Sequence, residues 1–166
     1  YGRLGRRVAR YGAAFDMSVR YHDPFVASDG TTERVDNLVD LVAWADVISL
    51  HVPALPETQN MINAHVIGQF KLGSLFINTA RAELVDEAAL LTALRDGRIA
   101  GYGADVLDGE FDLDFKAGEH PLVRHAQNHD NVLLTPHIAG STHDAWRETQ
   151  GRVIDMARRH FEDWKP

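Results

Sequence analysis

The sequence predicts an α/β protein built on a doubly wound parallel sheet. Short apolar runs bounded by turn residues recur along the chain, as expected for buried parallel strands. Helical patterns separate these runs, and most connections are short. Because such crossovers are right-handed, the carboxyl ends of the strands gather at one edge of the sheet, where open α/β sheets bind ligands.

Size and composition fit one soluble domain spanning residues 1–166. The chain is 45% apolar and 25% charged, which is ordinary for a globular protein. Its net charge of -7 argues against a nucleic-acid or anionic-membrane surface. The absence of cysteine excludes disulfides and thiolate metal sites, and it is compatible with the cytoplasmic location that we expect.

The first third of the chain predicts two helices and two strands. A glycine-led helix is expected from Leu4 to Phe15, followed by a strand over 19–23 that Pro24 closes. A short amphipathic helix is expected over 35–44. The next buried strand covers 47–51 and stops at Val52-Pro53.

The rest of the chain continues the alternation. The run Leu75-Phe76-Ile77 is the most clearly bounded strand, and the helix that begins at Asp86 carries acidic residues in its first turn. The remaining expected elements are a helix over 62–70, strands over 99–106 and 132–135, a polar loop over 111–130, and a last helix capped by Ser141-Thr142 and running toward Trp164.

The glycines at the start of the chain form part of a dinucleotide-binding pattern. Gly2-x-x-Gly5 opens the first helix, and Asp23 lies at the end of the following strand, at the spacing where a Rossmann-like domain places the acid that binds ribose. We expect Gly2 to admit a pyrophosphate and Gly5 to let the helix approach the sheet. The first glycine and the first strand of the pattern would precede Tyr1, so we expect a piece of a longer protein. Two glycines before a helix also occur in ordinary loops, and an acid before proline is also a common turn residue.

Three residues with functional chemistry follow three different strand ends. Arg81 suits a carboxylate, which it grips through two parallel hydrogen bonds. His137 has a side chain that exchanges protons near neutral pH, and Glu110 is the natural carboxylate to orient it. With a nicotinamide on the glycine loop, this set predicts hydride transfer coupled to proton transfer on a 2-oxo or 2-hydroxy acid.

Each of these residues also has a simpler interpretation. Arg81 can serve only to fix a loop, and most of the nine histidines must have no catalytic role. His120, His125 and His129 have a spacing that metal ligands also show, but they stand in a polar stretch without cysteine, so we expect no metal site.

In combination and order, the motifs resemble the NAD-binding domain of the D-isomer-specific 2-hydroxyacid dehydrogenases. The resemblance covers Gly2 to about Ala157. The motifs that carry it are Gly2-Arg3-Leu4-Gly5, Tyr21-His22-Asp23-Pro24, Ala45 to Pro53, Pro56-Glu57-Thr58, Ile77 to Arg81, Val85-Asp86-Glu87, Ala104-Asp105-Val106, Glu110, and Thr135 to Thr142.

The resemblance implies roles for these positions. Arg81 is similar to the substrate-binding arginine, His137 to the general acid/base, and Glu110 to the acid that pairs with that histidine. Asp23 is similar to the acid that binds the adenosine ribose and favours NAD over NADP. The positions implied to line the cofactor are Gly2, Arg3, Leu4, Gly5, Asp23, Val52, Pro53, Thr58, Thr79, Ala80, Asp105 and His137.

The sequence departs from the family pattern at two positions and leaves the activity open between several expectations. Ala82 and Phe111 replace a usual glycine and proline. The resemblance implies a homodimer, and it implies that a substrate domain outside this chain chooses among small acids such as hydroxypyruvate and glyoxylate. The alternatives are an NADH-sensing corepressor-like protein, a plain nucleotide-binding module, and oxidation of formate or phosphite.

Overall fold

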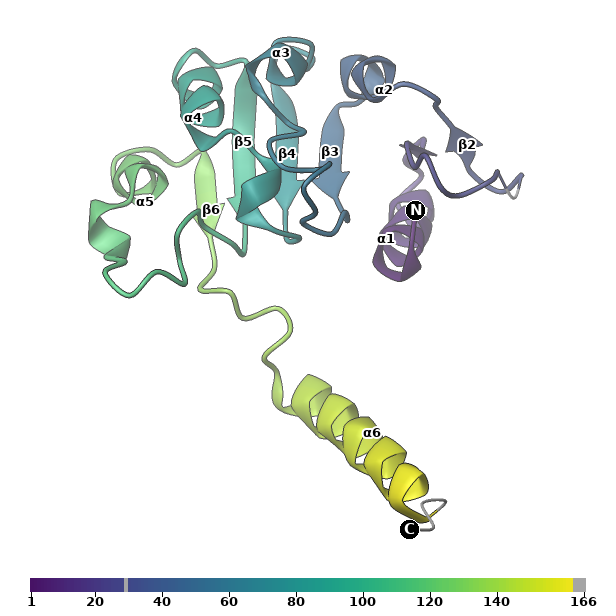
Figure 1. Cartoon of the computed structure of the whole chain (residues 1–166). Helices are drawn as coiled ribbons and strands as arrows, with labels where there is room; N and C mark the ends of the chain where they lie inside the picture. Colours follow the sequence, from purple (N-terminus) through teal and green to yellow (C-terminus); the bar gives the residue numbers. More distant parts are fainter. Residues whose placement is uncertain (29, 163–166) are drawn as a thin grey trace. The chain divides into compact units, whose positions relative to one another are not determined.

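The computed structural model describes residues 1–28 and 30–162, and it divides into two units, residues 1–134 and residues 135–166. The first unit contains all the strands (Figure 1). The second contains one long helix, α6 (His143–Glu162), which begins where Thr142 Oγ1 accepts a hydrogen bond from the Ala145 amide. Trp164, toward which that helix was expected to run, lies outside the described residues.

A four-stranded parallel sheet forms the centre of the first unit. Its order is β3-β4-β5-β6, which repeats the order of the chain. The strands are β3 (Val47–Leu50), β4 (Ser74–Asn78), β5 (Ile99–Ala104) and β6 (Val132–Leu134). The expected alternation of parallel strands and helices is therefore confirmed.

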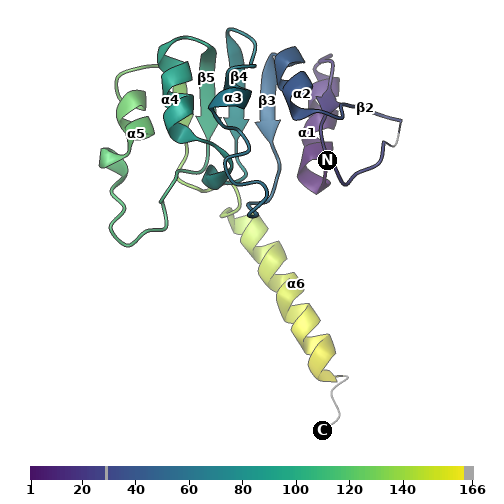
Figure 2. The same cartoon turned by 45° about the horizontal axis from the view of Figure 1, so that its top comes forward.

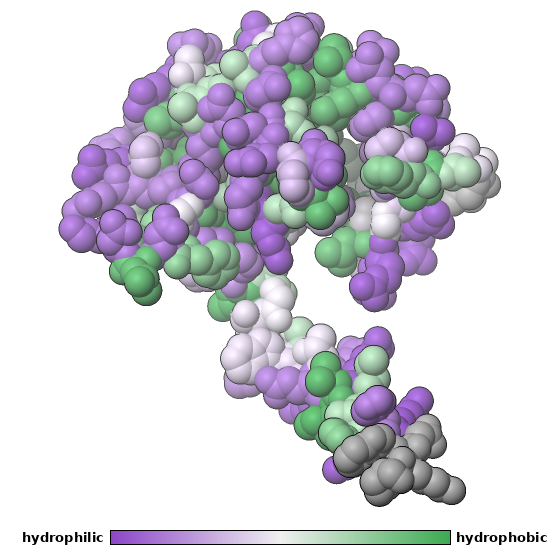
Figure 3. All heavy atoms as spheres, viewed as in Figure 1, coloured by the Kyte–Doolittle hydropathy of each residue, from purple (hydrophilic) through white to green (hydrophobic). Residues whose placement is uncertain are grey.

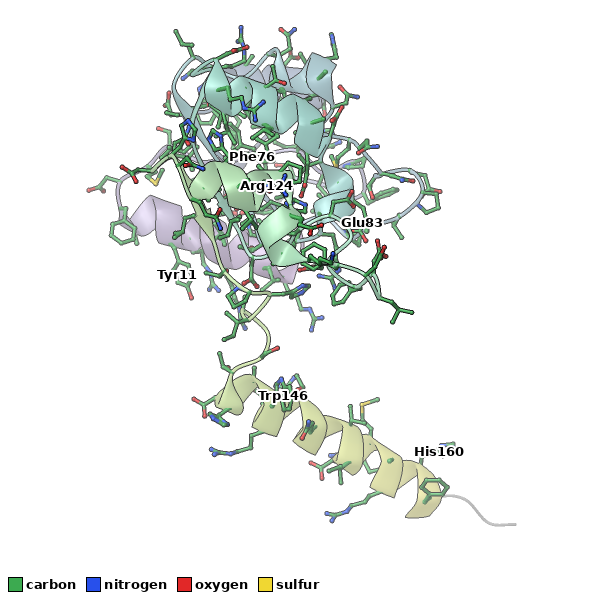
Figure 4. All side chains as sticks on the ribbon, turned by 90° about the vertical axis from the view of Figure 1, so that its left-hand side faces the viewer. Tyr11, Phe76, Glu83, Arg124, Trp146 and His160 are labelled. Carbon is green, nitrogen blue, oxygen red and sulfur yellow. The ribbon has the colours of Figure 1, made fainter. Side chains whose placement is uncertain are left out.

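Four helices form a layer against one face of this sheet (Figure 2). They are α2 (Leu38–Trp44), α3 (Ala64–Ile67), α4 (Glu87–Arg95) and α5 (Pro121–Ala126). Because each step along the sheet runs in the same direction, right-handed crossovers place the connecting helices on the same side. The core lies between the two layers, where Phe76 of β4 is fully buried against Phe70 and Tyr102 (Figure 4). On the opposite face, the β3, β4 and β6 side chains of Val47, Leu75 and Leu133 remain exposed.

A separate two-stranded sheet follows the first helix. Helix α1 (Arg3–Ala14) leads to β1 (Arg20–Tyr21), which pairs in parallel with β2 (Glu33–Arg34). Arg20 lies over the ring of Trp44 at 4.4 Å, so a cation–π contact connects β1 to α2. In the described residues no strand joins β1 to β3.

The helix α5 and the strand β2 differ from the sequence expectation. Residues 111–130 were expected to be a polar loop, but they contain the short helix η2 (Ala117–Glu119) and then α5. Pro121 occupies the first turn of α5, the His120 side chain accepts from the Leu122 amide, and Leu122 is fully buried. One buried leucine and a histidine cap are too weak a pattern to recognise among polar residues. The strand β2 was missed because it is two residues long.

Candidate functional site

The turn after β4 presents Arg81. Asn78, the last residue of the strand, is fully buried. Its Oδ1 accepts a hydrogen bond from the Ala80 amide at 3.0 Å, and its Nδ2 donates to the Arg81 carbonyl at 2.9 Å. Arg81 is exposed, and its Nη1 donates to the Ala80 carbonyl at 2.6 Å. The buried amide therefore fixes the backbone from which the guanidinium extends. From the sequence, Asn78 was recognised only as part of the motif Ile77 to Arg81, and no role was expected for it.

A cleft of about 400 Å³ lies beside this turn. Its lining comes from the start of α1 and from the segments that follow β3 and β4. The residues that line it are Leu4, His51, Val52, Pro53, Ala54, Thr79, Ala80 and Arg81. Six of these eight were expected at a cofactor or substrate site. The fold brings them together from three segments that are far apart in the sequence.

The start of α1 leaves room for a ligand. Gly2 is the N-cap, and a Cβ built on it would meet no atom within 4 Å. The helix has no side-chain cap and no acidic residue in its first turn. The amides of Arg3, Leu4 and Gly5 therefore lie at the positive end of the helix dipole, which favours an anion. This arrangement fits the pyrophosphate of a dinucleotide.

Gly5 lies beside the residue that directly follows β3. A Cβ on Gly5 would lie 3.7 Å from the Cβ of His51, which is ordinary contact distance. The imidazole of His51 lies in the cleft lining and hydrogen-bonds to Ser49 Oγ at 3.0 Å. Burial lowers the pKa of His51, which favours the neutral ring. His51 was not among the expected site residues.

Asp23 lies two residues after β1, at the position expected for the ribose acid. Its carboxylate accepts a hydrogen bond from the Phe25 amide at 2.9 Å, which stabilises the ionised form. The carboxylate is therefore ionised at neutral pH and can accept hydrogen bonds from hydroxyl groups.

Two further expected residues are held by their own loops. The Thr58 hydroxyl donates to the Pro53 carbonyl at 2.8 Å and accepts from the Leu55 amide at 2.9 Å, so it closes the segment that forms one wall of the cleft. Asp105 follows β5 and is buried, and its amide donates to the Asn78 carbonyl. Neither residue is among those that line the cleft.

Glu110 stands in the segment after β5 and is half-buried, with its amide bonded to the Leu107 carbonyl at 3.2 Å. Its charge acts on Glu87, at the start of α4. Burial raises the pKa of Glu87 to about 7; a hydrogen bond from the Asp108 amide opposes this shift, and the charges of Asp108 and Glu110 add to it. From the sequence, Glu87 was recognised only as part of the motif Val85-Asp86-Glu87, and no role was expected for it.

His137 belongs to the second unit and has an unusual backbone. It adopts a left-handed conformation with φ of 50°, and its amide donates to the Thr135 carbonyl at 3.0 Å. Histidine tolerates this region better than most residues, but the conformation still costs free energy and is typical of functional segments. The sequence places His137 directly after a proline and gives no signal for this turn.

The histidines considered as metal ligands each have another hydrogen-bond partner. His120 pairs with Glu87, His125 bonds to Asn131 Oδ1 at 2.9 Å, and His129 bonds to the His125 carbonyl at 3.1 Å. The rings of His125 and His129 stack in parallel at 4.0 Å, a geometry that does not converge on an ion. Residues 1–28 and 30–162 hold no group of three or more side chains suited to a metal, and no helix among them is long and apolar enough to cross a membrane.

Comparison with known proteins decides the family. The profile of the D-isomer specific 2-hydroxyacid dehydrogenase NAD-binding domain matches residues 1–139. The chain belongs to this family. The expectations of an NAD-binding domain and of a Rossmann-like sheet are both confirmed.

Several members of the 2-hydroxyacid dehydrogenase family are similar to this chain. It is 36% identical to the (S)-sulfolactate dehydrogenase of Chromohalobacter salexigens, covering 96% of the chain and 50% of that protein. It is 38% identical to the glycerate dehydrogenase of Methylorubrum extorquens, over 93% and 46% of the two chains. The structure of Aquifex aeolicus D-lactate dehydrogenase with NAD and lactic acid has a TM-score of 0.85 and 36% identity, over 97% of this chain and 51% of that one. The chain thus spans about half the length of these dehydrogenases.

Proposed function

We propose that this chain is the cofactor domain of an NAD-dependent oxidoreductase that interconverts a D-2-hydroxy acid and its 2-oxo acid. The observation that carries the proposal is a cleft lined both by Arg81, in the turn after β4, and by Leu4, in the uncapped first turn of α1. The sulfolactate, glycerate and lactate dehydrogenases supply the substrate class, a small 2-hydroxy acid. Hydroxypyruvate and glyoxylate are plausible 2-oxo acids of this class.

The cofactor is held through backbone and ribose contacts. The amides of Arg3, Leu4 and Gly5 bind the pyrophosphate, Asp23 binds the adenosine ribose, and the segments after β3 and β4 line the nicotinamide half. NADH supplies the hydride when it is bound. An ionised carboxylate at Asp23 repels a 2′-phosphate, so NAD is preferred over NADP. Relatives with NADPH bound do occur, such as an acyclic imino acid reductase with 27% identity and a TM-score of 0.84.

The substrate is oriented and protonated by side chains. Arg81 binds the carboxylate of the 2-oxo acid through its guanidinium fork and polarises the neighbouring carbonyl. His137 Nε2 or Nδ1 donates a proton to the carbonyl oxygen during reduction and recovers it in the reverse direction. Glu110 pairs with the imidazole, which favours the protonated ring. The protein is expected to be a cytoplasmic homodimer with a substrate domain beyond this chain.

The first test follows NADH absorbance with the protein produced from its complete gene. Hydroxypyruvate, glyoxylate and pyruvate are offered with NADH and with NADPH. The His137→Ala variant is compared with His143→Ala, a substitution of the same residue type at an exposed position in the same unit. We expect turnover with at least one acid, a loss of about 10²-fold or more in His137→Ala, an unchanged NADH dissociation constant, and normal turnover in His143→Ala.

Two other outcomes separate the alternatives. Formate oxidation is the second candidate, because a formate dehydrogenase from Granulicella is 28% identical with a TM-score of 0.86. NADH formation from NAD with formate or phosphite, and none from 2-hydroxy acids, would replace our substrate class. Tight NADH binding without turnover on any of these compounds would contradict the enzyme and favour an NADH-sensing protein.

A further inference from the structure

Glu87, the first residue of α4, makes two contacts with a segment that is distant in sequence. Its Oε1 accepts a hydrogen bond from the Asp108 amide at 3.1 Å. Its Oε2 lies 3.1 Å from His120 Nε2. The side chains of Glu87 and His120 are only 15% and 9% exposed, so water competes weakly for these contacts. One carboxylate therefore holds both ends of the segment 108–120.

The hydrogen bonds of His120 fix its tautomer. Its Nδ1 accepts from the Leu122 amide at 3.3 Å and so carries no proton. The proton is therefore on Nε2, which donates to Glu87. The Phe115 ring packs near the imidazole, with centroids 5.9 Å apart, and further shields this contact. His120 thus joins the start of α5 to the start of α4 in one orientation.

The segment between these two contacts carries Glu110. Its internal backbone hydrogen bonds join residues only three apart: the Asp112 amide donates to Gly109, the Phe115 amide to Asp112, the Glu119 amide to Lys116 and the His120 amide to Ala117. It is also strongly acidic, so its charges repel one another. The acidic residues are Asp108, Glu110, Asp112, Asp114 and Glu119. A segment of this kind needs an external anchor to keep one conformation.

We propose that Glu87 is a positioning residue that closes the segment 108–120 through Asp108 and His120 and thereby fixes the backbone that presents Glu110. The catalytic consequence rests on the proposed function, in which Glu110 pairs with the proton-donating histidine. The closure itself does not depend on that function, because it is a property of the fold within residues 1–134.

The charges around Glu87 make the closure sensitive to pH. The groups that face it are Asp108, Glu110, His120 and, through charge, Tyr102. Burial raises the pKa of Glu87 to about 7. Because burial in the closed segment favours the protonated carboxyl, ionisation of Glu87 as pH rises through about 7 weakens the closure, and the two hydrogen bonds then oppose this loss.

Amide hydrogen exchange read by mass spectrometry tests the closure directly on the protein produced from its complete gene. Three variants are compared at pH 8: Glu87→Ala, Glu87→Gln and, as control, Glu83→Ala. Glu83 is exposed and lies in η1 (Ala82–Leu84), close to Glu87 in sequence (Figure 4). Glutamine keeps an acceptor for the Asp108 amide and loses the charge.

We expect Glu87→Ala to speed exchange in peptides covering 108–120 about tenfold or more, which corresponds to a loss of about 1.4 kcal/mol of local closure. Glu87→Gln is expected to restore protection near Asp108 but not near His120, and Glu83→Ala to leave the segment unchanged. Unchanged exchange in Glu87→Ala overturns the proposal, and so does equal acceleration in Glu83→Ala.

Steady-state kinetics on the same variants test the consequence for Glu110. With a substrate that the wild type turns over, Glu87→Ala should lower kcat about tenfold while the KM for NADH stays unchanged, and Glu87→Gln should recover part of kcat. Faster exchange with an unchanged kcat overturns the positioning role and leaves a purely structural closure. If the wild type itself has no turnover, the proposed function has failed, and hydrogen exchange alone decides the closure.

Discussion

Asn78 and Arg81 are joined by a hydrogen bond of 2.9 Å from the buried side-chain amide of Asn78 to the backbone carbonyl of Arg81. The same side chain accepts from the Ala80 amide, so both ends of one turn are fixed by a single residue. A buried asparagine is costly unless its polar atoms are paired, and here the pairing partners belong to the turn that presents the expected substrate-binding cation. The rigidity of the cleft wall thus originates inside the core.

Replacing Asn78 tests this arrangement. Asn78→Ala leaves two partly buried backbone groups without this partner, and an unpaired buried group costs about 1–3 kcal/mol. We expect urea unfolding to show a loss in that range. Asn128→Ala is the matched control, because Asn128 Nδ2 also donates to a backbone carbonyl but the residue is exposed. A loss in Asn128→Ala equal to that in Asn78→Ala would contradict the role of burial.

Arg81→Lys keeps the positive charge and removes the planar fork. We expect kcat/KM for the 2-oxo acid to fall about tenfold or more, because a charge-assisted hydrogen bond is worth about 1.5–3 kcal/mol. The dissociation constant of NADH should stay unchanged, since the guanidinium is assigned to the substrate. Stopped-flow binding and steady-state rates measure the two quantities. Weaker NADH binding with unchanged kcat/KM would indicate that Arg81 binds the cofactor and not the substrate.

The position of Asp23 predicts cofactor choice. Asp23→Ala should weaken NADH binding about tenfold, which corresponds to about 1.4 kcal/mol for the lost ribose contact. Combining Asp23→Ser with Pro24→Arg should admit NADPH, because the repelling carboxylate is replaced by a cation. Fluorescence titration with both cofactors measures this, with Asp40→Ala, an exposed acid on α2, as control. Unchanged affinity of the Asp23 variants for both cofactors would show that Asp23 does not bind the ribose.

The raised pKa of Glu87 predicts how stability depends on pH. Its pKa is about 7 in the folded protein against an ordinary 4.5, so the folded state binds the proton more tightly. The contribution of Glu87 to stability is therefore present below pH 4.5 and is lost as pH rises to about 7. Glu87→Gln cannot titrate, so its free energy of unfolding should improve relative to wild type between pH 5 and pH 8.

His120 titrates in the same region and must be separated from this effect. Burial lowers its pKa, so the folded state resists protonation and stability falls as pH drops below the ordinary value of 6.5. The unfolding free energy therefore changes with pH in opposite directions for His120 and Glu87. Measuring urea unfolding of wild type, Glu87→Gln and Glu83→Gln at pH 5 and pH 8 isolates the Glu87 contribution. Parallel stability changes in wild type and Glu87→Gln would show that Glu87 has an ordinary pKa.

The sequence by itself determined the order of the four strands of the main sheet, the helices between them except α5, and the segments that line the cleft. Strands such as β4 are recognisable because a buried parallel strand needs a continuous apolar run, and α4 because an acidic cap precedes an apolar period. An apolar run and an acidic cap are local features, so they can be recognised without knowledge of the fold. The same locality explains why α5 was missed, since one buried leucine among polar residues has no period.

Only the tertiary structure decided which polar groups meet. Asn78 bonds to a turn three residues away, but its burial depends on β5 and the helix layer packing over it. Glu87 meets the Asp108 amide and His120 across the sheet edge, and His51 contacts Gly5 from another strand end. The left-handed turn at His137 is likewise invisible in the sequence. Hydrogen bonding and pKa depend on distances and burial, which are set when distant segments pack together, and no spacing along the chain encodes them.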